Sequence, residues 1–162
     1  MTYNLIARVG LPHEDLSILQ TVLETSLAKA SSHSKKVYGK NPLTVQDVLD
    51  LANSRALTLA ATAKPSGKPH LSPTDLVAVD ERLYLGVDVA TARYRNLKKN
   101  PAIAVMMADG YKRQAILEGT VDFLDMEGQT AKRVGETQRK KYGWVTDALA
   151  EFNPEKAFTW KL

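Results

Sequence analysis

The feature that most constrains the fold is a change in hydrophobic period near residue 55. Upstream of this point, apolar residues recur every three or four positions, which is typical of an amphipathic helix. Downstream, short extended runs alternate with turn residues: RALTLAATA, the turn KPSG, KPHLSPTDLVAV, the turn DE and RLYLGV. These runs predict three antiparallel strands in a meander.

A second group of strands follows one helical interruption. The segment TARYRNLKKNP predicts a short crossover helix, because Thr91 can cap its start and Asn100-Pro101 ends it. AIAVMMA is almost continuously apolar, which predicts a strand buried on both faces, and QAILEGTVDFL alternates like a half-buried strand. With AFTWKL as a short closing strand, about six strands are expected.

Helical patterns flank the strands. Thr44 can cap a helix in an approximate capping box with Asp47. In order, we expect a helix over residues 12–30, a loop over 31–42, a helix from Thr44 to near Asn53, a helix over 126–142 and a short helix over 146–151. The pattern predicts one α+β domain over residues 1–162, with a helical segment over 1–54 and an antiparallel barrel with flanking helices over 55–162.

Composition excludes several classes of function. The chain has no cysteine, so a disulfide framework, a thiol nucleophile and thiolate metal ligands are ruled out. The histidines at positions 13, 33 and 70 lack the spacing of metal ligands, so no metal site is expected. No apolar run approaches the ~20 residues of a membrane helix and the N-terminus does not resemble a signal peptide, so we expect a cytoplasmic protein without a membrane partner.

Positive charge is concentrated in one part of the chain. The cations are Arg93, Arg95, Lys98, Lys99, Lys112 and Arg113, with only Asp109 of opposite sign between them. Together with a helix N-terminus at Thr91, Arg93 or Arg95 could form a phosphate seat. The two arginines would point about 200° apart on a helix, so at most one should face a ligand. The alternative is a solvated helix face, which is where we expect Lys98 and Lys99.

The sequence HLSPTD contains a proline where a strand is expected. Pro73 removes a hydrogen-bond donor, so this point must be an edge, a bulge or a bend. The backbone groups and hydroxyls of Ser72 and Thr74 would then be free to recognise a flat heteroaromatic ring. His70, which lies beside the turn, is expected to be a surface residue rather than an acid or base.

Three segments, in this order, resemble the FMN-binding split β-barrels related to pyridoxamine 5′-phosphate oxidase. They are LTLAATAKPSGKPHLSPTDLVAVDERLYLGV, TARYRNLKKNPAIAVMM and RQAILEG, and they span roughly residues 55–125. Two departures concern the type of member. The paired Arg-Lys of the family stands here as Ala92-Arg93, and AEFNPEKAFTWKL has no counterpart of the segment that recognises pyridoxal phosphate. The oxidation of pyridoxamine phosphate itself is therefore not expected.

The resemblance implies an antiparallel split β-barrel that binds FMN and acts as an oxidoreductase on an unidentified small molecule. The residues expected to contact the cofactor are Ser72, Pro73, Thr74, Gly86, Val87, Thr91, Arg93, Arg95 and Gln114. Of the two arginines the resemblance favours Arg93, and Gln114 is either a flavin contact or an exposed strand residue. No catalytic residue is assigned, because a redox cofactor would carry the chemistry.

Other functions stay open. A deazaflavin could replace FMN, and a haem-binding protein or a flavin-binding protein without catalytic activity is a further alternative. Nucleic-acid binding would use the basic clusters with Tyr94, Tyr111 and Tyr142. We instead expect these tyrosines in the core or the cofactor wall, and no nucleic-acid partner.

The resemblance also implies a homodimer with the cofactor at the subunit interface. A barrel of about six short strands has too little interior for a tricyclic ring, so the ring must lie outside it and needs a second wall. Two-fold symmetry would supply that wall twice. AIAVMMA, Tyr84 and Trp160 are candidates for the buried contact, or else for the monomer core.

Overall fold

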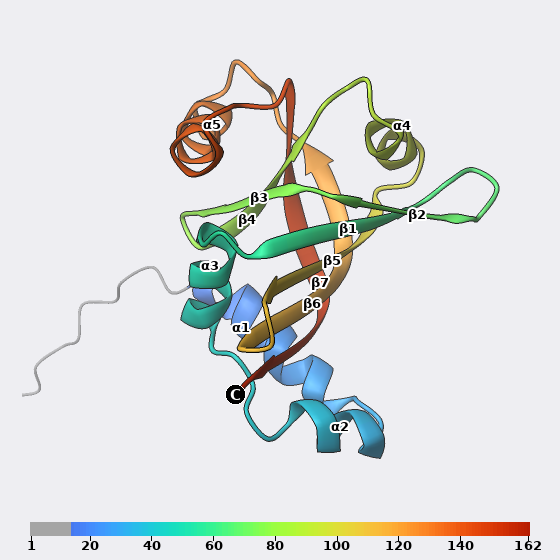
Figure 1. The fold of residues 1–162 in the computed structure, drawn as a ribbon, viewed down its shortest axis with the longest axis vertical. Helices are drawn as coiled ribbons and strands as arrows, with labels where there is room; N and C mark the ends of the chain where they lie inside the picture. Colours follow the sequence, from blue (N-terminus) through green and yellow to red (C-terminus); the bar gives the residue numbers. More distant parts are fainter. Residues whose placement is uncertain (1–13) are drawn as a thin grey trace, which may run out of the picture.

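Seven antiparallel strands form one curled sheet in the computed structural model, which describes residues 14–162 (Figure 1). The strands are β1 (Leu57–Ala63), β2 (Pro69–Pro73), β3 (Asp75–Val79), β4 (Arg82–Val87), β5 (Ala102–Asp109), β6 (Arg113–Phe123) and β7 (Ala148–Lys161). Their order across the sheet is β2-β1-β5-β6-β7-β4-β3. This is the α+β split β-barrel that the sequence predicted.

Helices surround the sheet. They are α1 (Glu14–Ala28), α2 (Ser32–Tyr38), α3 (Val45–Asn53), α4 (Ala92–Lys99) and α5 (Gln129–Tyr142). α1 packs on β7, α3 and α5 pack on β3, and α4 packs on β1. Figure 1 shows α4 and α5 at one end of the sheet and α2 at the other. None of these helices is long and apolar enough to span a membrane.

Helix starts follow the local signals in the sequence. The Thr44 hydroxyl accepts a hydrogen bond from Asp47 N at 3.1 Å, and the Asp47 carboxylate accepts one from Thr44 N at 2.9 Å, which completes the predicted capping box. Likewise the Thr91 hydroxyl accepts from Tyr94 N at 3.2 Å and caps α4. The predicted helix over residues 12–30 is confirmed as α1, except that residues 12 and 13 and the expected absence of a signal peptide lie outside the described residues.

Two segments have a different type of secondary structure from the one predicted. Residues 32–38 form α2 instead of a loop, because the Ser31 hydroxyl caps the helix through Ser34 N and Tyr38 packs on Phe158 at 5.1 Å between ring centroids. Residues 148–151 belong to the long strand β7 instead of a short helix. This segment pairs with β4 on one side and with β6 on the other, and that non-local pairing outweighs its local helical preference.

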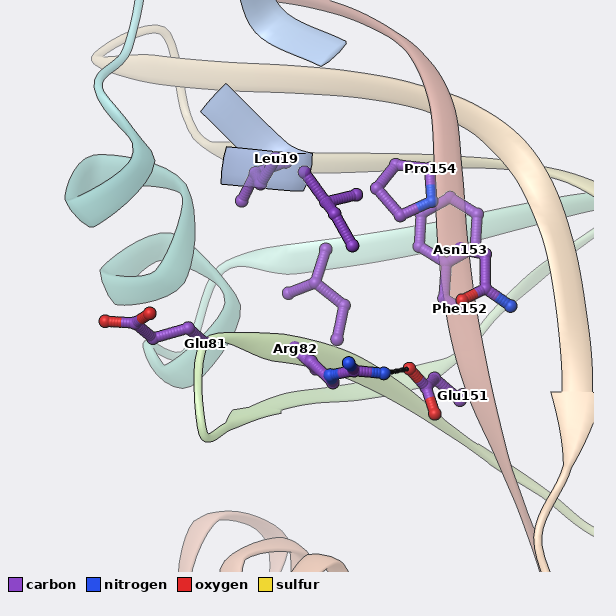
Figure 2. A pocket seen from close by; sticks show the side chains of 9 residues that line it. Leu19, Glu81, Arg82, Glu151, Phe152, Asn153 and Pro154 are labelled. Atoms are coloured by element: carbon purple, nitrogen blue, oxygen red, sulfur yellow. Dashed lines mark hydrogen bonds and ion pairs between the residues drawn. The ribbon is translucent and has the colours of Figure 1, made fainter. Parts of the chain in front are cut away.

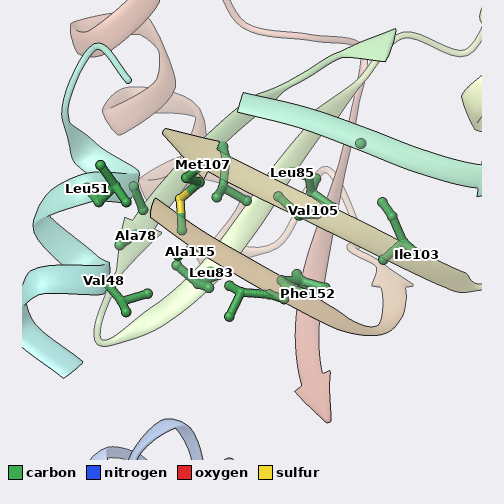
Figure 3. Packing of buried hydrophobic residues seen from close by; sticks show 14 of the residues in the cluster. Val48, Leu51, Ala78, Leu83, Leu85, Ile103, Val105, Met107, Ala115 and Phe152 are labelled. Atoms are coloured by element: carbon green, nitrogen blue, oxygen red, sulfur yellow. The ribbon is translucent and has the colours of Figure 1, made fainter. Parts of the chain in front are cut away.

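The core lies inside the curl of the sheet. Figure 3 shows Val48 and Leu51 of α3 facing Leu83 of β4, Met107 of β5 and Phe152 of β7. Each fully buried side chain of this kind contributes roughly 1.5–3 kcal/mol through the hydrophobic effect. The core therefore fixes α3 and one face of the sheet.

β5 does not have the expected burial on both faces. Ile103, Val105 and Met107 are buried, whereas Ala104 and Met106 on the opposite face are partly exposed. Only one face of this strand lies against the core, so its burial alternates although its sequence is almost uniformly apolar. Tyr84 packs in a second buried cluster of this chain, so it belongs to the monomer core.

Candidate cofactor site

The predicted irregularity at Pro73 is the junction between β2 and β3. Pro73 is the last residue of β2 and pairs with Leu59 of β1. Thr74 N then donates to Thr58 O at 3.1 Å, after which Asp75 pairs with β4. The expected single strand over residues 68–79 is therefore two strands, because the chain leaves one neighbour and joins another where proline interrupts the ladder.

Arg93 of α4 reaches this junction. Its Nη1 donates to Ser72 Oγ at 2.8 Å and to Pro73 O at 2.6 Å, and the residue is only 8% exposed. Thr91, the N-cap of the same helix, sets the start of α4 so that Arg93 faces inward. The structure thus brings together four of the predicted residues: Ser72, Pro73, Thr74 and Arg93.

Buried polar atoms without a partner gather at this junction. In the described part of the chain, the buried side-chain polar atoms that lack a hydrogen bond are Arg93 Nε, Thr74 Oγ1 and His70 Nδ1. His70 lies two residues before Ser72 on the same face of β2. Leaving such a group unpaired costs roughly 1–3 kcal/mol. Native proteins therefore have few of them, and an unpaired buried group indicates a place where a ligand or a water molecule completes the hydrogen bond. The expectation that His70 is simply a surface residue is wrong for its Nδ1 atom.

The electrostatic environment of Arg93 is mixed. Burial lowers the pKa of its guanidinium, while the nearby carboxylates of Asp75 and Asp88 act in the opposite direction. An arginine remains charged in proteins, so the junction carries a buried cation whose hydrogen bonds go to a hydroxyl and a carbonyl.

Arg95 and Asn96 lie elsewhere on α4. Arg95 is exposed and its Nη1 donates to Ala90 O at 2.9 Å, so only one of the two arginines faces the junction, as the helical spacing predicted. Asn96 is buried and its Nδ2 donates to Thr62 Oγ1 at 3.0 Å. Asn96 therefore holds the helix on β1.

Gly86 and Val87 end β4 beside the junction, since Gly86 pairs with Asp75. A Cβ atom on Gly86 would lie 2.0 Å from Gln138 Nε2 and 2.7 Å from Thr146 Oγ1. Val87 is completely buried. Both residues pack against side chains of this chain, so their place in the structure is explained by packing.

Three further residues surround the junction and were not predicted as part of a site. Asp75 Oδ2 accepts hydrogen bonds from Gln138 Nε2 at 3.1 Å and from Trp144 Nε1 at 2.7 Å. Asp75 is the one acidic residue of the apolar strand DLVAV, which was the only sequence signal for it. Gln138 and Trp144 come from α5 and the turn after it, more than sixty residues away.

Gln114 does not join this cluster within one chain. It lies near the start of β6, and its Nε2 donates to Gly110 O at 3.4 Å. Through β1 and β5, Ser72 is in register with Leu117. Three strand spacings and three residues along β6 therefore separate Ser72 from Gln114 by roughly 17 Å between Cα atoms, and their side chains lie on opposite faces of the sheet.

Gln114 lies instead on an apolar face of the sheet. We call this the outer apolar face, and its large residues are Leu57, Leu59, Leu71, Met106, Ile116 and Trp160. Leu57 is 59% exposed and Leu71 is 63% exposed. Met106 of the segment AIAVMMA and Trp160 thus occupy a surface that the described residues leave partly uncovered.

A pocket lies away from the junction. Figure 2 shows it between α1, β4 and β7, with Leu19, Phe152 and Pro154 on its wall and an ion pair between Arg82 and Glu151 at 2.5 Å beside it. None of the predicted cofactor residues lines this pocket.

Solved structures share this fold at low sequence identity. A conserved hypothetical protein of Mycobacterium tuberculosis has a TM-score of 0.62 at 22% identity, over 74% of this chain and 85% of that one. HutZ, described as the haem storage protein of Vibrio cholerae, has a TM-score of 0.59 at 17% identity, over 72% and 92%. An F420 reductase has a TM-score of 0.53 at 21% identity, over 67% and 93%. No curated protein matches.

A sequence family identifies the chain more directly than these structures do. The family model described as pyridoxamine 5′-phosphate oxidase matches residues 45–161, which include α3, all seven strands, and the junction with Arg93. The match therefore covers both the split barrel and its candidate site. The chain belongs to the pyridoxamine 5′-phosphate oxidase family.

Proposed function

We propose that the protein binds FMN at the junction of β2 and β3 and is an oxidoreductase that acts on a small molecule. The observation that carries the proposal is the pair of unpaired buried groups, Arg93 Nε and Thr74 Oγ1. Both can donate a hydrogen bond, and phosphate oxygens accept such bonds. The residues present therefore fit the anionic end of FMN.

Arg93 is prepared for this role by its neighbours. Its Nη1 is held by Ser72 Oγ and Pro73 O, so the guanidinium does not have to be ordered when a ligand binds. The carboxylates of Asp75 and Asp88 partly offset its charge, which reduces the attraction for a doubly charged group. We expect Arg93 to orient the phosphate through directed hydrogen bonds more than through net charge.

FMN would supply the electron-transfer chemistry when it is bound. The chain would supply binding and orientation, with Arg93 and Thr74 at the phosphate and the backbone of residues 72–74 beside the ring. We assign no catalytic residue, and the substrate is an unidentified small molecule.

Titration with FMN tests the proposal. The wild-type protein should quench FMN fluorescence on binding, and Arg93→Ala should weaken binding by about 1.5–3 kcal/mol through loss of a charged hydrogen bond. Lys99→Ala is the matched control, because Lys99 is an exposed cation in the last turn of the same helix. Wild-type protein that neither binds FMN nor quenches it, or equal losses in the two variants, would contradict the assignment.

A deazaflavin or haem is the second candidate for the ligand. The F420 reductase and HutZ have the same fold, which is a likeness of fold alone at these identities. The unpaired His70 Nδ1 is a further polar atom that a different ligand could use. The absorbance and mass spectra of the ligand that co-purifies with the protein would separate the three, since haem has a Soret band and neither flavin does.

We further propose that the working unit is a homodimer in which each cofactor site takes Gln114 from the partner subunit. Gln114 lies on the outer apolar face, and roughly 17 Å separates it from Ser72 within one chain. A second copy on that face would bury Leu57 and Leu71 and supply the second wall for the ring. Light scattering at micromolar concentration tests this, and a monomeric mass that persists with saturating FMN would rule it out.

A further inference from the structure

Trp144 is an exposed aromatic residue with a fixed orientation. α5 ends at Tyr142, and Gly143 adopts a left-handed conformation with φ 89°. This turn brings the Trp144 ring back over Tyr142, with ring centroids 5.7 Å apart and planes 26° apart. Trp144 is nevertheless 55% exposed.

Both rings are tied to the edge strand β3. Tyr142 Oη accepts a hydrogen bond from Leu76 N at 3.1 Å and donates one to Leu76 O at 3.1 Å. Trp144 Nε1 donates to Asp75 Oδ2 at 2.7 Å. Residues that merely stabilise a fold bury their aromatic area, whereas this indole is held in place and left accessible. A preordered aromatic side chain loses little conformational entropy when it contacts a ligand.

The position of Trp144 relates it to the candidate cofactor site. Asp75, its anchor, directly follows Thr74, and Arg93 Nη1 donates to Ser72 Oγ and Pro73 O immediately before Thr74. Arg93 therefore reaches the junction from α4, and Trp144 lies beside it on the α5 side. Arg93 and Trp144 thus approach the junction from α4 and from the turn after α5, just as the phosphate and the ring of FMN lie at the two ends of its ribityl chain.

We propose that Trp144 is a stacking platform for the planar ring of the ligand whose anionic group Arg93 holds. The inference rests on the proposed function and adds a specificity-determining residue to that site. Arg93 Nη1 donates to Pro73 O and Lys141 Nζ donates to Leu76 O, so a cation is bound to the backbone on each side of Asp75 along the chain. The platform therefore suits an uncharged or anionic heteroaromatic ring better than a cationic one.

Ring and phosphate can be probed separately. Riboflavin carries the ring without the phosphate, and inorganic phosphate carries the anion without the ring. We expect Trp144→Ala to weaken riboflavin binding at least about fivefold, as measured by quenching of riboflavin fluorescence, because stacking on an aromatic side chain is worth roughly 1–3 kcal/mol per ring. Trp144→Phe should keep most of the affinity, and protection of the folded protein by phosphate against thermal unfolding should be unchanged in both.

Two controls separate stacking from a structural role. Val37→Ala removes an exposed apolar side chain from α2, at the other end of the molecule, and should leave riboflavin binding unchanged. Asp75→Asn keeps an oxygen acceptor for the indole N–H, so it should retain riboflavin binding, whereas Asp75→Ala should weaken it.

The outcomes distinguish this inference from the proposed function. Equal riboflavin affinity in Trp144→Ala and Val37→Ala would overturn the platform, and so would failure of the wild-type protein to bind riboflavin. The platform would also be overturned if Trp144→Ala lost phosphate protection to the same extent as riboflavin affinity. The same holds if Trp144→Ala changed only the mass of the protein in light scattering and left riboflavin affinity unchanged. In each of these cases the effect of Arg93→Ala on FMN would still decide the proposed function.

Discussion

Gly86→Ala tests how tightly the end of β4 is packed against α5. The new Cβ atom would lie 2.0 Å from Gln138 Nε2, so Gln138 would have to move. Gln138 is only 1% exposed, and it donates to Asp75 Oδ2 and Thr146 Oγ1, both at 3.1 Å. Its Oε1 accepts from Thr146 N, also at 3.1 Å. The side chain has no free direction in which to turn without leaving these groups unpaired.

The cost of this substitution can be estimated from the contacts. Overpacking of a core typically costs about 1–3 kcal/mol, and each broken hydrogen bond about 1 kcal/mol. We therefore expect Gly86→Ala to lower the free energy of unfolding by about 3 kcal/mol. For a chain of this size that corresponds to a fall in Tm of roughly 6–12 °C.

Thermal and urea unfolding followed by circular dichroism would measure the effect. Gly135→Ala in α5 is the matched control, because its Cβ atom would meet Val145 Cγ1 at an ordinary 3.5 Å. That variant should gain about 0.5–1 kcal/mol from its better helix propensity. Gln138→Ala should cost less in the Gly86→Ala background than in the wild type, since the clash is then relieved. An unchanged Tm in Gly86→Ala, or additive losses in the double variant, would refute this account of the packing.

Three other measurements follow from single contacts. Gln114→Ala should alter the spectrum or the potential of bound flavin more than its affinity, and an unchanged spectrum with an unchanged potential would count against the contact. The hydrogen bond from Lys161 to Asp47, at 2.7 Å, and the Thr44 N–H lower the pKa of Asp47 to about 2. The stabilisation they give, at most about 1 kcal/mol for a partly exposed pair at the surface, should be complete above pH 4 and lost as the pH falls through 2. Asp47→Asn should remove this dependence in urea titrations. Burial lowers the pKa of Lys141 to about 8, from 10.5. The unfolded chain then binds this proton more tightly, so stability should rise between pH 8 and 10.5 relative to Lys141→Met, and parallel curves would show that the shift is absent.

The parts of the fold that were predictable depend on neighbours in the sequence. Thr44 and Asp47 are three residues apart, and Thr91 caps a helix that starts at the next residue, so both helix starts could be inferred locally. The break at Pro73 was predictable for the same reason, since proline lacks the donor itself. The helical geometry of α4 was also enough to predict that Arg93 and Arg95 point in different directions, because residues two positions apart on a helix lie about 200° apart.

The parts that were missed depend on partners far along the chain. Residues 148–151 are a strand because β4 and β6 pair with them, and neither pairing leaves a trace in the segment itself. Asp75 and Trp144 are 69 residues apart, so their hydrogen bond could not be inferred from either position. The unpaired Arg93 Nε is likewise a property of packing, because it requires knowing every atom around the guanidinium.

The same segment of chain protects an edge of the sheet and builds part of the candidate site. β3 is an edge strand, and exposed edges invite pairing with other chains. Tyr142 satisfies both backbone groups of Leu76, and Lys141 Nζ donates to Leu76 O at 2.7 Å. Side chains of α5 therefore bond an edge that no strand within residues 14–162 pairs with. The next turn of this segment delivers Trp144 to Asp75. A variant that loosens α5 should therefore expose the edge and displace the indole together, which couples stability at this end of the sheet to the binding of a ring.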